Sequence, residues 1–184
     1  MIVALRDARP EDATRIADIF LASRAAFLPY ARSPHPEASV RAWVRDILLQ
    51  HETVTVALTA DEPVGFLAMH HVEQTTWISQ LYLDPPFVGQ GIGSRLLAHA
   101  LAGASPPIRL YTFQRNAAAH RFYERNGFSP IQCTDGAANE ERCPDVLDEL
   151  EIQADIAAPT CRHRQFAKRY NERNVRHEPA RLPS

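Results

Sequence analysis

Three alternating glycines follow a short apolar run and a Pro-Pro pair in residues 81–97, LYLDPPFVGQGIGSRLL: Gly89, Gly91 and Gly93. Glycines spaced this closely let backbone N–H groups point into one concavity, because no Cβ atoms block the approach. The sequence predicts a helix that opens on Gly93, and its unpaired N–H groups and positive dipole end would face the same space. The stretch therefore predicts a binding site for a phosphate or pyrophosphate, and hence a phosphorylated cofactor.

Two common phosphate-binding motifs do not fit these residues. A P-loop places a lysine and then Ser or Thr after its last glycine, whereas Ser94 and Arg95 follow Gly93. The dinucleotide fingerprint G-x-G-x-x-G, counted from Gly89, would need a glycine where Ser94 stands, and the next predicted strand does not end in an acidic residue. An ordinary glycine-rich turn remains the alternative on this stretch alone.

The stretch instead resembles the coenzyme A loop of the GNAT acetyltransferase superfamily, in which Q/R-x-x-G-x-G/A lies between a strand and a helix. Gly91 and Gly93 occupy the two glycine positions. Val88 stands where the family has Gln or Arg, which is a departure. Because that position donates its backbone N–H in the family, the resemblance implies a mild effect, although a charge near the phosphates is missing.

Residues 116–128, NAAAHRFYERNGF, predict a short helix that begins after an Asn cap and ends at Gly127. The segment resembles the second GNAT signature, N-x-x-A-x-x-F-Y-E-x-x-G-F, at every fixed position. In that family the asparagine, here Asn116, contacts the pantetheine arm, and the tyrosine, here Tyr123, lies beside the cofactor sulfur. A phenol with a pKa of about 10 can protonate the leaving thiolate. The alternative for Tyr123 is a core aromatic packed beside Phe122.

Together the two signatures imply an N-acetyltransferase that moves an acetyl group from acetyl-CoA to a primary amine of a small molecule, peptide or protein. The amine would attack directly, with Tyr123 as general acid. A regulatory module that binds the acyl-CoA but turns it over weakly, if at all, is the alternative function. The resemblance implies cofactor contacts from a strand, the loop and a helix: Leu81, Tyr82, Leu83, Val88, Gly89, Gln90, Gly91, Ile92, Gly93, Ser94, Asn116 and Tyr123.

The general base is not identified by the sequence. Many GNAT relatives use a glutamate, or a water held by one, on or near the fourth strand, but residues 77–83 contain no carboxylate. His71 and Glu73 share one face of the preceding strand and could hold a water, whereas His70 lies on the other face. These positions are also consistent with solvated polar residues at a strand end.

The acceptor site is predicted around residues 134–145, TDGAANEERCPD, which resemble a T-D-G-x-x-N-E-E-x-x-P-D loop of a bacterial subgroup of these enzymes. Three acidic side chains of this loop could recognise a cationic amine or supply the base: Asp135, Glu140 and Glu141. A turn-rich acidic loop without such a role is the alternative. Tyr30 and His35, in the loop after the first helix, are further candidates for the acceptor wall.

Composition sets the remaining expectations. The 184 residues carry a formal net charge of −2, so neither a nucleic-acid nor a membrane partner is required. Three widely spaced cysteines favour reduced thiols in a cytoplasm, and no metal site is expected. We expect a monomer or homodimer with one domain over residues 1–152. Residues 153–184 are predicted to form a basic, flexible tail, because from Ala157 onward seven Arg or Lys face two acidic residues.

The periodicity of apolar residues predicts an α/β (α+β) fold with strands and helices in the order β-α-α-β-β-β-α-β-α-β-β. The resemblance implies a mixed sheet of six to seven strands, helices on both faces, and a fourth and fifth strand that splay apart. The predicted helices cover residues 10–27, 37–50, 93–102 and about 116–126. The predicted strands cover residues 3–6, 53–59, 64–72, 77–83, 108–113, 128–133 and 145–152.

Overall fold

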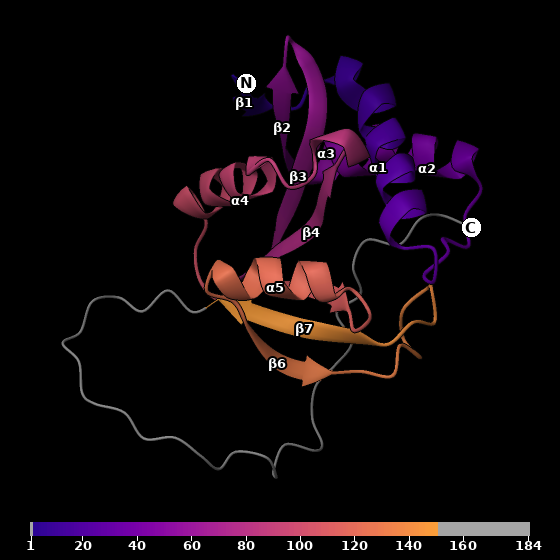
Figure 1. The fold of residues 1–184 in the computed structure, drawn as a ribbon, viewed down its shortest axis with the longest axis vertical. Coiled ribbons are helices and arrows are strands. Elements are labelled where there is room, and N and C mark those ends of the chain that lie inside the picture. The colour runs from indigo at the N-terminus through magenta and orange to yellow at the C-terminus, as the bar shows by residue number, and fades with distance from the viewer. Residues whose placement is uncertain (1, 151–184) are drawn as a thin grey trace, which may run out of the picture.

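The structure is a computed structural model that describes residues 2–150. Seven strands form one mixed sheet in the order β1-β2-β3-β4-β5-β7-β6 (Figure 1). The strands are β1 (Ala4–Asp7), β2 (Thr53–Thr59), β3 (Glu62–Val72), β4 (Thr75–Leu83), β5 (Ile108–Phe113), β6 (Ser129–Cys133) and β7 (Asp145–Leu150). The helices are α1 (Ala13–Phe27), α2 (Glu37–Trp43), α3 (Leu49–His51), α4 (Ile92–Ala102) and α5 (Ala117–Arg125). The predicted fold class and order of elements are confirmed.

Helices α1 and α2 cover one face of the first four strands. Ile16, Ile19 and Phe20 of α1 pack with Val40 and Trp43 of α2 against the strands. The helix predicted over residues 37–50 is a continuous helical segment, but a π-helical turn, η2 (Val44–Leu48), separates α2 from α3. Nothing in the sequence signalled the extra residue in that turn.

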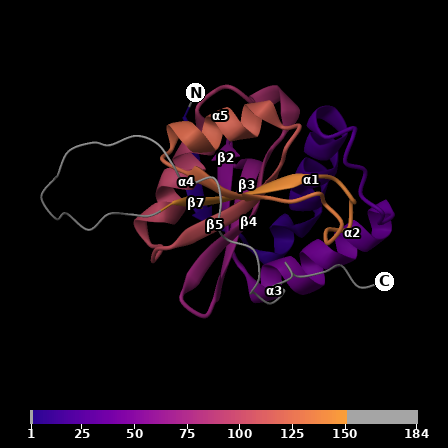
Figure 2. The ribbon, with the colours of Figure 1, turned by 90° about the horizontal axis from the view of Figure 1, so that it is seen from below.

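Helices α4 and α5 cover the opposite face, and Figure 2 shows them across the strands from α2 and α3. Ile92, Leu96 and Leu97 of α4 are fully buried against β2, β3 and β4. Tyr123 of α5 joins the same core next to Phe128. Both faces of the sheet are therefore covered, as the resemblance implied.

Strands β4 and β5 are parallel, but they pair only at Thr76–Ile108 and Trp77–Arg109. Beyond that point β4 stays paired with β3, while β5 follows β7 over all six of its residues. The backbone edges of β4 and β5 therefore separate within one sheet, which confirms the predicted splay. Figure 1 shows β6 and β7 diverging from the first four strands.

Strand β7 is acidic, and the structure explains how its carboxylates are accommodated. Asp148 is buried and accepts a hydrogen bond of 2.7 Å from the Thr112 hydroxyl. Glu149 accepts a hydrogen bond of 2.6 Å from Arg109 Nε. Both carboxylates have a partner on β5, so the charges do not prevent strand formation.

Strand β4 contains a β-bulge that matters for the site. Ala68 of β3 lies opposite Gln80, but the next residue, Met69, lies opposite Ile78, so Ser79 is the extra residue. A bulge re-aims side chains and is frequent beside active sites. The bulge lies on the part of β4 that has left β5.

Two predictions concern properties beyond the sheet. Among residues 2–150, no helix is long and apolar enough to cross a membrane. The basic tail predicted over residues 153–184, and the last two residues of the strand predicted over 145–152, lie outside the described residues.

Candidate active site

The glycine loop presents an open backbone surface. Gly89 and Gly91 have φ values of +82° and +79°, a left-handed conformation that favours glycine, and a Cβ on either would meet no atom within 4 Å. A Cβ on Gly93 would instead lie 3.5 Å from Phe122 and 3.7 Å from Leu83. The missing side chain of Gly93 therefore points toward α5. Gly89 and Gly91 are the glycines that leave space free on the open side of the loop.

The N–H groups of this loop are available to a ligand. In the part of the chain that the structure describes, the six consecutive backbone N–H groups of residues 89–94 have no hydrogen-bond acceptor. They include the first N–H groups of α4, where the helix dipole is positive. Gln90 turns its side chain back onto the Pro86 carbonyl, 2.8 Å away, and Ile92 is buried, so these two residues offer only backbone groups to the loop's open side. The arrangement can bind an anion such as a pyrophosphate.

The free edge of β4 continues this surface. The Asp84 N–H donates to the Val64 carbonyl at 2.9 Å, and hydrogen bonding to one neighbour alternates along an antiparallel strand. Tyr82 therefore turns its backbone groups toward β3, while Leu81 and Leu83 turn theirs toward the opened side. An extended amide-containing ligand could pair with these groups as an added strand does.

A cavity of about 110 Å³ lies where β4 and β5 separate. Its walls come from both strands, from α5 and its N-cap, and from the residue that follows α1: Leu28, Ile78, Ser79, Gln80, Leu81, Tyr82, Leu110, Tyr111, Thr112, Phe113, Asn116, Ala119 and Tyr123. The cavity thus brings Leu81 and Tyr82, from the strand before the glycine loop, together with Asn116 and Tyr123 of the second signature.

Tyr123 and Asn116 reach this cavity from α5. Tyr123 packs edge-on against Phe122 and Phe128, and its hydroxyl has no hydrogen-bond partner among residues 2–150. Burial raises the pKa of Tyr123, and the fields of Tyr82 and Asp148 raise it further, so the phenol keeps its proton. The Asn116 Oδ1 accepts the Ala119 N–H at 3.1 Å and caps the helix, and the Asn116 amide nitrogen has no partner among residues 2–150.

The sheet separates His70 from His71, and the prediction that Glu73 shares a strand face with His71 is wrong, because β3 ends at Val72. His71 turns to the α4 face, where its Nδ1 lies 3.1 Å from the Thr76 hydroxyl. Glu73 is exposed in the turn between β3 and β4, with φ +54°. His70 lies on the opposite face, where α1 and α2 pack, with its Nδ1 3.6 Å from a Glu52 carboxylate oxygen.

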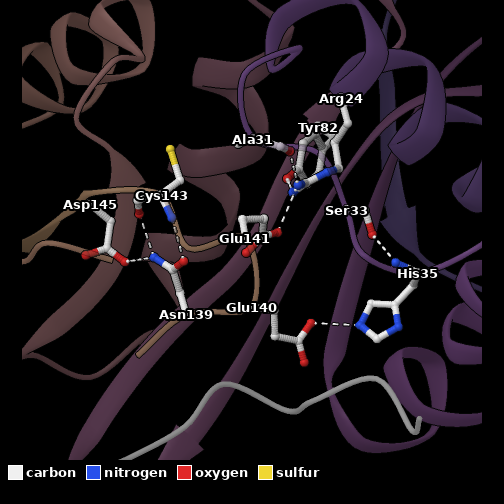
Figure 3. A network of polar contacts seen from close by, with 10 residues as sticks. All are labelled: Arg24, Ala31, Ser33, His35, Tyr82, Asn139, Glu140, Glu141, Cys143 and Asp145. Atoms are coloured by element: carbon white, nitrogen blue, oxygen red, sulfur yellow. Dashed lines mark hydrogen bonds and ion pairs between the residues drawn. The ribbon is translucent and has the colours of Figure 1, made fainter. Parts of the chain in front are cut away.

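The acidic loop between β6 and β7 is built by four residues of its motif. Asn139 donates to the Cys143 carbonyl at 2.7 Å and to Asp145 at 2.8 Å (Figure 3). Thr134 also hydrogen-bonds to Asp145. Gly136 has φ +77°, and a Cβ there would lie 2.3 Å from the Cys143 backbone. These positions of the loop therefore serve its conformation.

The three acidic residues predicted to meet the acceptor have different environments. Glu141 Oε1 accepts from Arg24 at 2.8 Å, and Glu140 Oε2 lies 2.9 Å from His35 Nε2 (Figure 3). The first contact joins the loop to α1, and the second joins it to the segment after α1. Asp135 is exposed, and it accepts the N–H two residues ahead at 2.9 Å, so it caps its own turn.

Arg24 is the centre of the contact between the loop and α1. It donates to the Ala31 carbonyl at 2.8 Å and lies over the Phe20 and Phe113 rings. Burial lowers the pKa of Arg24, but Tyr82 and Glu141 raise it by more, so the guanidinium remains charged. The Tyr30 ring meets Phe113 edge-on nearby, and its buried hydroxyl has no hydrogen-bond partner among residues 2–150.

Glu52, which precedes β2, is a site residue that the sequence did not predict. Its side chain is 4% exposed, and its carboxylate accepts a hydrogen bond from the Ser79 hydroxyl. Ser79 is the bulge residue of β4 and lines the cavity. The sequence could not indicate this contact, because it depends on the bulge and joins residues 27 positions apart.

Comparison with known proteins identifies the family. The model of the Acetyltransferase (GNAT) family matches residues 16–128. The peptidyl-lysine N-acetyltransferase YjaB of Salmonella typhimurium is 29% identical over 130 residues, which cover 70% of this chain and 84% of that protein. The aminoalkylphosphonate N-acetyltransferase of the same organism is 39% identical over 84 residues, or 40% of this chain and 54% of that protein.

Solved structures share the fold. The solution structure of apo YjaB from Escherichia coli superimposes with a TM-score of 0.64 and 25% identity, over 81% of this chain and 97% of that one. The PaiA N-acetyltransferase of Thermoplasma acidophilum, in complex with coenzyme A, gives a TM-score of 0.67 at 20% identity, over 83% of this chain and 100% of that one.

Proposed function

The chain belongs to the GNAT acetyltransferase family, whose enzymes use acetyl-CoA, and we propose that it transfers the acetyl group to a primary amine of a peptide, protein or small molecule. One observation carries the proposal. Tyr123 lines the cavity between the parted strands, and β4, which forms one wall of that cavity, leads into the loop whose six N–H groups have no acceptor within residues 2–150. The named relatives, which act on peptidyl-lysine and on aminoalkylphosphonates, support an amine acceptor.

The chain's own groups fit each part of acetyl-CoA. The N–H groups of residues 89–94 bind the pyrophosphate, since they lie at a helix N-terminus and lack acceptors within residues 2–150. The backbone groups of Leu81 and Leu83 pair with the pantetheine amides. The Asn116 amide nitrogen, free of the capping bond, contacts the same arm. These contacts orient the thioester in the cavity beside Tyr123.

Tyr123 supplies the proton that the leaving sulfur needs. When the amine nitrogen bonds to the thioester carbon, the carbon–sulfur bond breaks and a thiolate leaves. The buried phenol keeps its proton across the physiological pH range, so it is ready to donate. Transfer is direct, and no covalent enzyme intermediate is needed.

The acceptor approaches from the face that carries Tyr30, His35 and the acidic loop. The carboxylates of Glu140 and Glu141 give this entrance a negative potential, although Arg24 and His35 contact them. Trp77 and Tyr111 stack at the point where the strands part, with ring centroids 5.7 Å apart and planes 12° apart. Aromatic faces suit a cation on an apolar stem.

The experiment that tests the proposal measures free-thiol release from acetyl-CoA across an amine panel. The panel contains an N-terminally blocked lysine peptide, free peptide N-termini, polyamines, amino acids, aminoglycosides and 2-aminoethylphosphonate. We expect amine-dependent release, with the acetyl group found on a primary amine by mass spectrometry. Tight binding of acetyl-CoA without release on any amine would favour the regulatory module instead.

A further inference from the structure

A buried carboxylate with one close hydrogen-bond donor lies behind the cavity. The Glu52 side chain is 4% exposed, and the Ser79 hydroxyl donates to its Oε2. The His70 Nδ1 lies 3.6 Å from the same oxygen, beyond hydrogen-bond range, and has no other partner among residues 2–150. Buried carboxylates are usually satisfied by several donors, so this one retains the capacity to accept a proton.

The position of Ser79 connects this carboxylate to the reaction site. Ser79 is the extra residue of the β4 bulge, on the stretch that has left β5, and it lines the cavity that Tyr123 also lines. A hydroxyl both donates and accepts, so it can take a proton from the cavity while it passes its own proton on.

We propose that Glu52, acting through the Ser79 hydroxyl, receives the proton that the acceptor ammonium must lose before it attacks acetyl-CoA. The proposal rests on the proposed function. It assigns Ser79 as the residue that touches the amine and Glu52 as the residue that holds and activates Ser79.

The protons balance in the resulting sequence. The ammonium gives one proton to Ser79, which passes its own to Glu52, and Glu52 releases it to solvent past the partly exposed His70. The neutral nitrogen then uses its lone pair to bond to the carbonyl carbon, and the carbon–sulfur bond breaks. Tyr123 gives its proton to the sulfur and recovers one from the nitrogen. The products are the amide, the free thiol and one released proton.

The other carboxylates and histidines are less suited to this role. Glu141 and Glu140 are held by Arg24 and His35, respectively. His71 lies on the α4 face of the sheet. Within residues 2–150, the titratable side chain that lies against Glu52 is His70 of β3. His51 at the end of α3 is exposed, and β2 and β4 carry no charged side chain.

The test compares pH–rate profiles of Glu52→Gln, Ser79→Ala and the wild type, with the best acceptor from the panel and saturating acetyl-CoA. Glu62→Gln, which alters an exposed acid at the start of β3, is the matched control. Near pH 7 we expect kcat/KM for the amine to fall about 10²- to 10⁴-fold in both test variants, the usual range for general-base loss. The control should be unchanged.

The pH dependence separates a proton acceptor from a structural residue. An amine with a pKa near 10 becomes neutral without help as the pH rises. In Glu52→Gln and Ser79→Ala, kcat/KM should therefore rise about tenfold per pH unit and approach the wild-type value near pH 10. Acetyl-CoA affinity should match that of the wild type.

Two results would overturn the relay. A wild-type profile in Ser79→Ala, or a deficit of the same factor at every pH, would show that the cluster only supports the fold. Failure of the wild type to acetylate any amine would instead refute the proposed function itself, and the relay with it. Ser79→Ala removes only a hydroxyl, so it tests the relay even where Glu52→Gln misfolds. Circular dichroism checks that each variant is folded.

Discussion

Replacing Gly91 with valine should weaken acetyl-CoA binding strongly while leaving the protein folded. Gly91 has φ +79° and caps α4 at its N-terminus, and a Cβ there would meet no protein atom within 4 Å. The side chain would therefore enter the space beside the free N–H groups. A β-branched residue also resists a left-handed backbone, so the loop should shift away from its binding conformation.

The magnitude follows from the groups affected. A left-handed backbone costs a residue with a side chain about 1–2 kcal/mol, less than the roughly 5–15 kcal/mol that holds a domain folded. A hydrogen bond to a charged group is worth about 1.5–3 kcal/mol, so losing two raises Kd by about 10²- to 10⁴-fold. The binding loss should thus be far larger than the change in stability.

Calorimetric titration with acetyl-CoA measures the change, and circular dichroism checks the fold. Gly103→Val is the matched control, because Gly103 ends the same helix, also has open space around its Cβ position, and has φ −111°. Its affinity should equal that of the wild type. An unchanged Kd in a folded Gly91→Val protein would refute the assignment of the loop to the phosphates.

Two further variants test the chemistry and the acceptor face. Tyr123→Phe keeps the ring between Phe122 and Phe128, so kcat should fall about 10²- to 10⁴-fold with unchanged acetyl-CoA affinity in steady-state and titration assays. Full activity would make Tyr123 a core residue only. Glu140→Gln should raise the acceptor KM in low salt, and the increase should shrink when added salt screens the charge. Asp135→Asn should change the acceptor KM little, because Asp135 caps its own turn. Equal effects of the two substitutions would contradict this difference in role.

The helices and strands could be predicted because turn residues, cap residues and apolar periodicity each act over a few neighbouring positions. The glycines at 89–93 and the Asn116 to Gly127 segment carry turn and cap residues at fixed spacing, and the apolar periodicity of α4 places Leu96 and Leu97 in the core. The splay was implied only by the resemblance. Its physical cause is long-range, since β5 follows β7 away from β4.

The site was harder to predict where contacts join distant segments. Side chains alternate between the two faces of a strand, but the sequence does not show which face each helix covers. It therefore could not show that His70 rather than His71 faces Glu52. The Arg24–Glu141 pair spans 117 positions and has no local signature. Gly93 was grouped with Gly91 by its spacing, yet its missing side chain faces Phe122. Tertiary packing decides each of these.

The most direct test of the account is amide hydrogen exchange of the wild-type protein with and without acetyl-CoA. Acetyl-CoA should slow exchange at residues 89–94, where six N–H groups lack acceptors in the described structure, and at Leu81 and Leu83 on the free edge of β4. Amides of β1, at the far edge of the sheet, should exchange at the same rate in both samples. Unchanged exchange in the loop and in β4 at saturating acetyl-CoA would contradict the account.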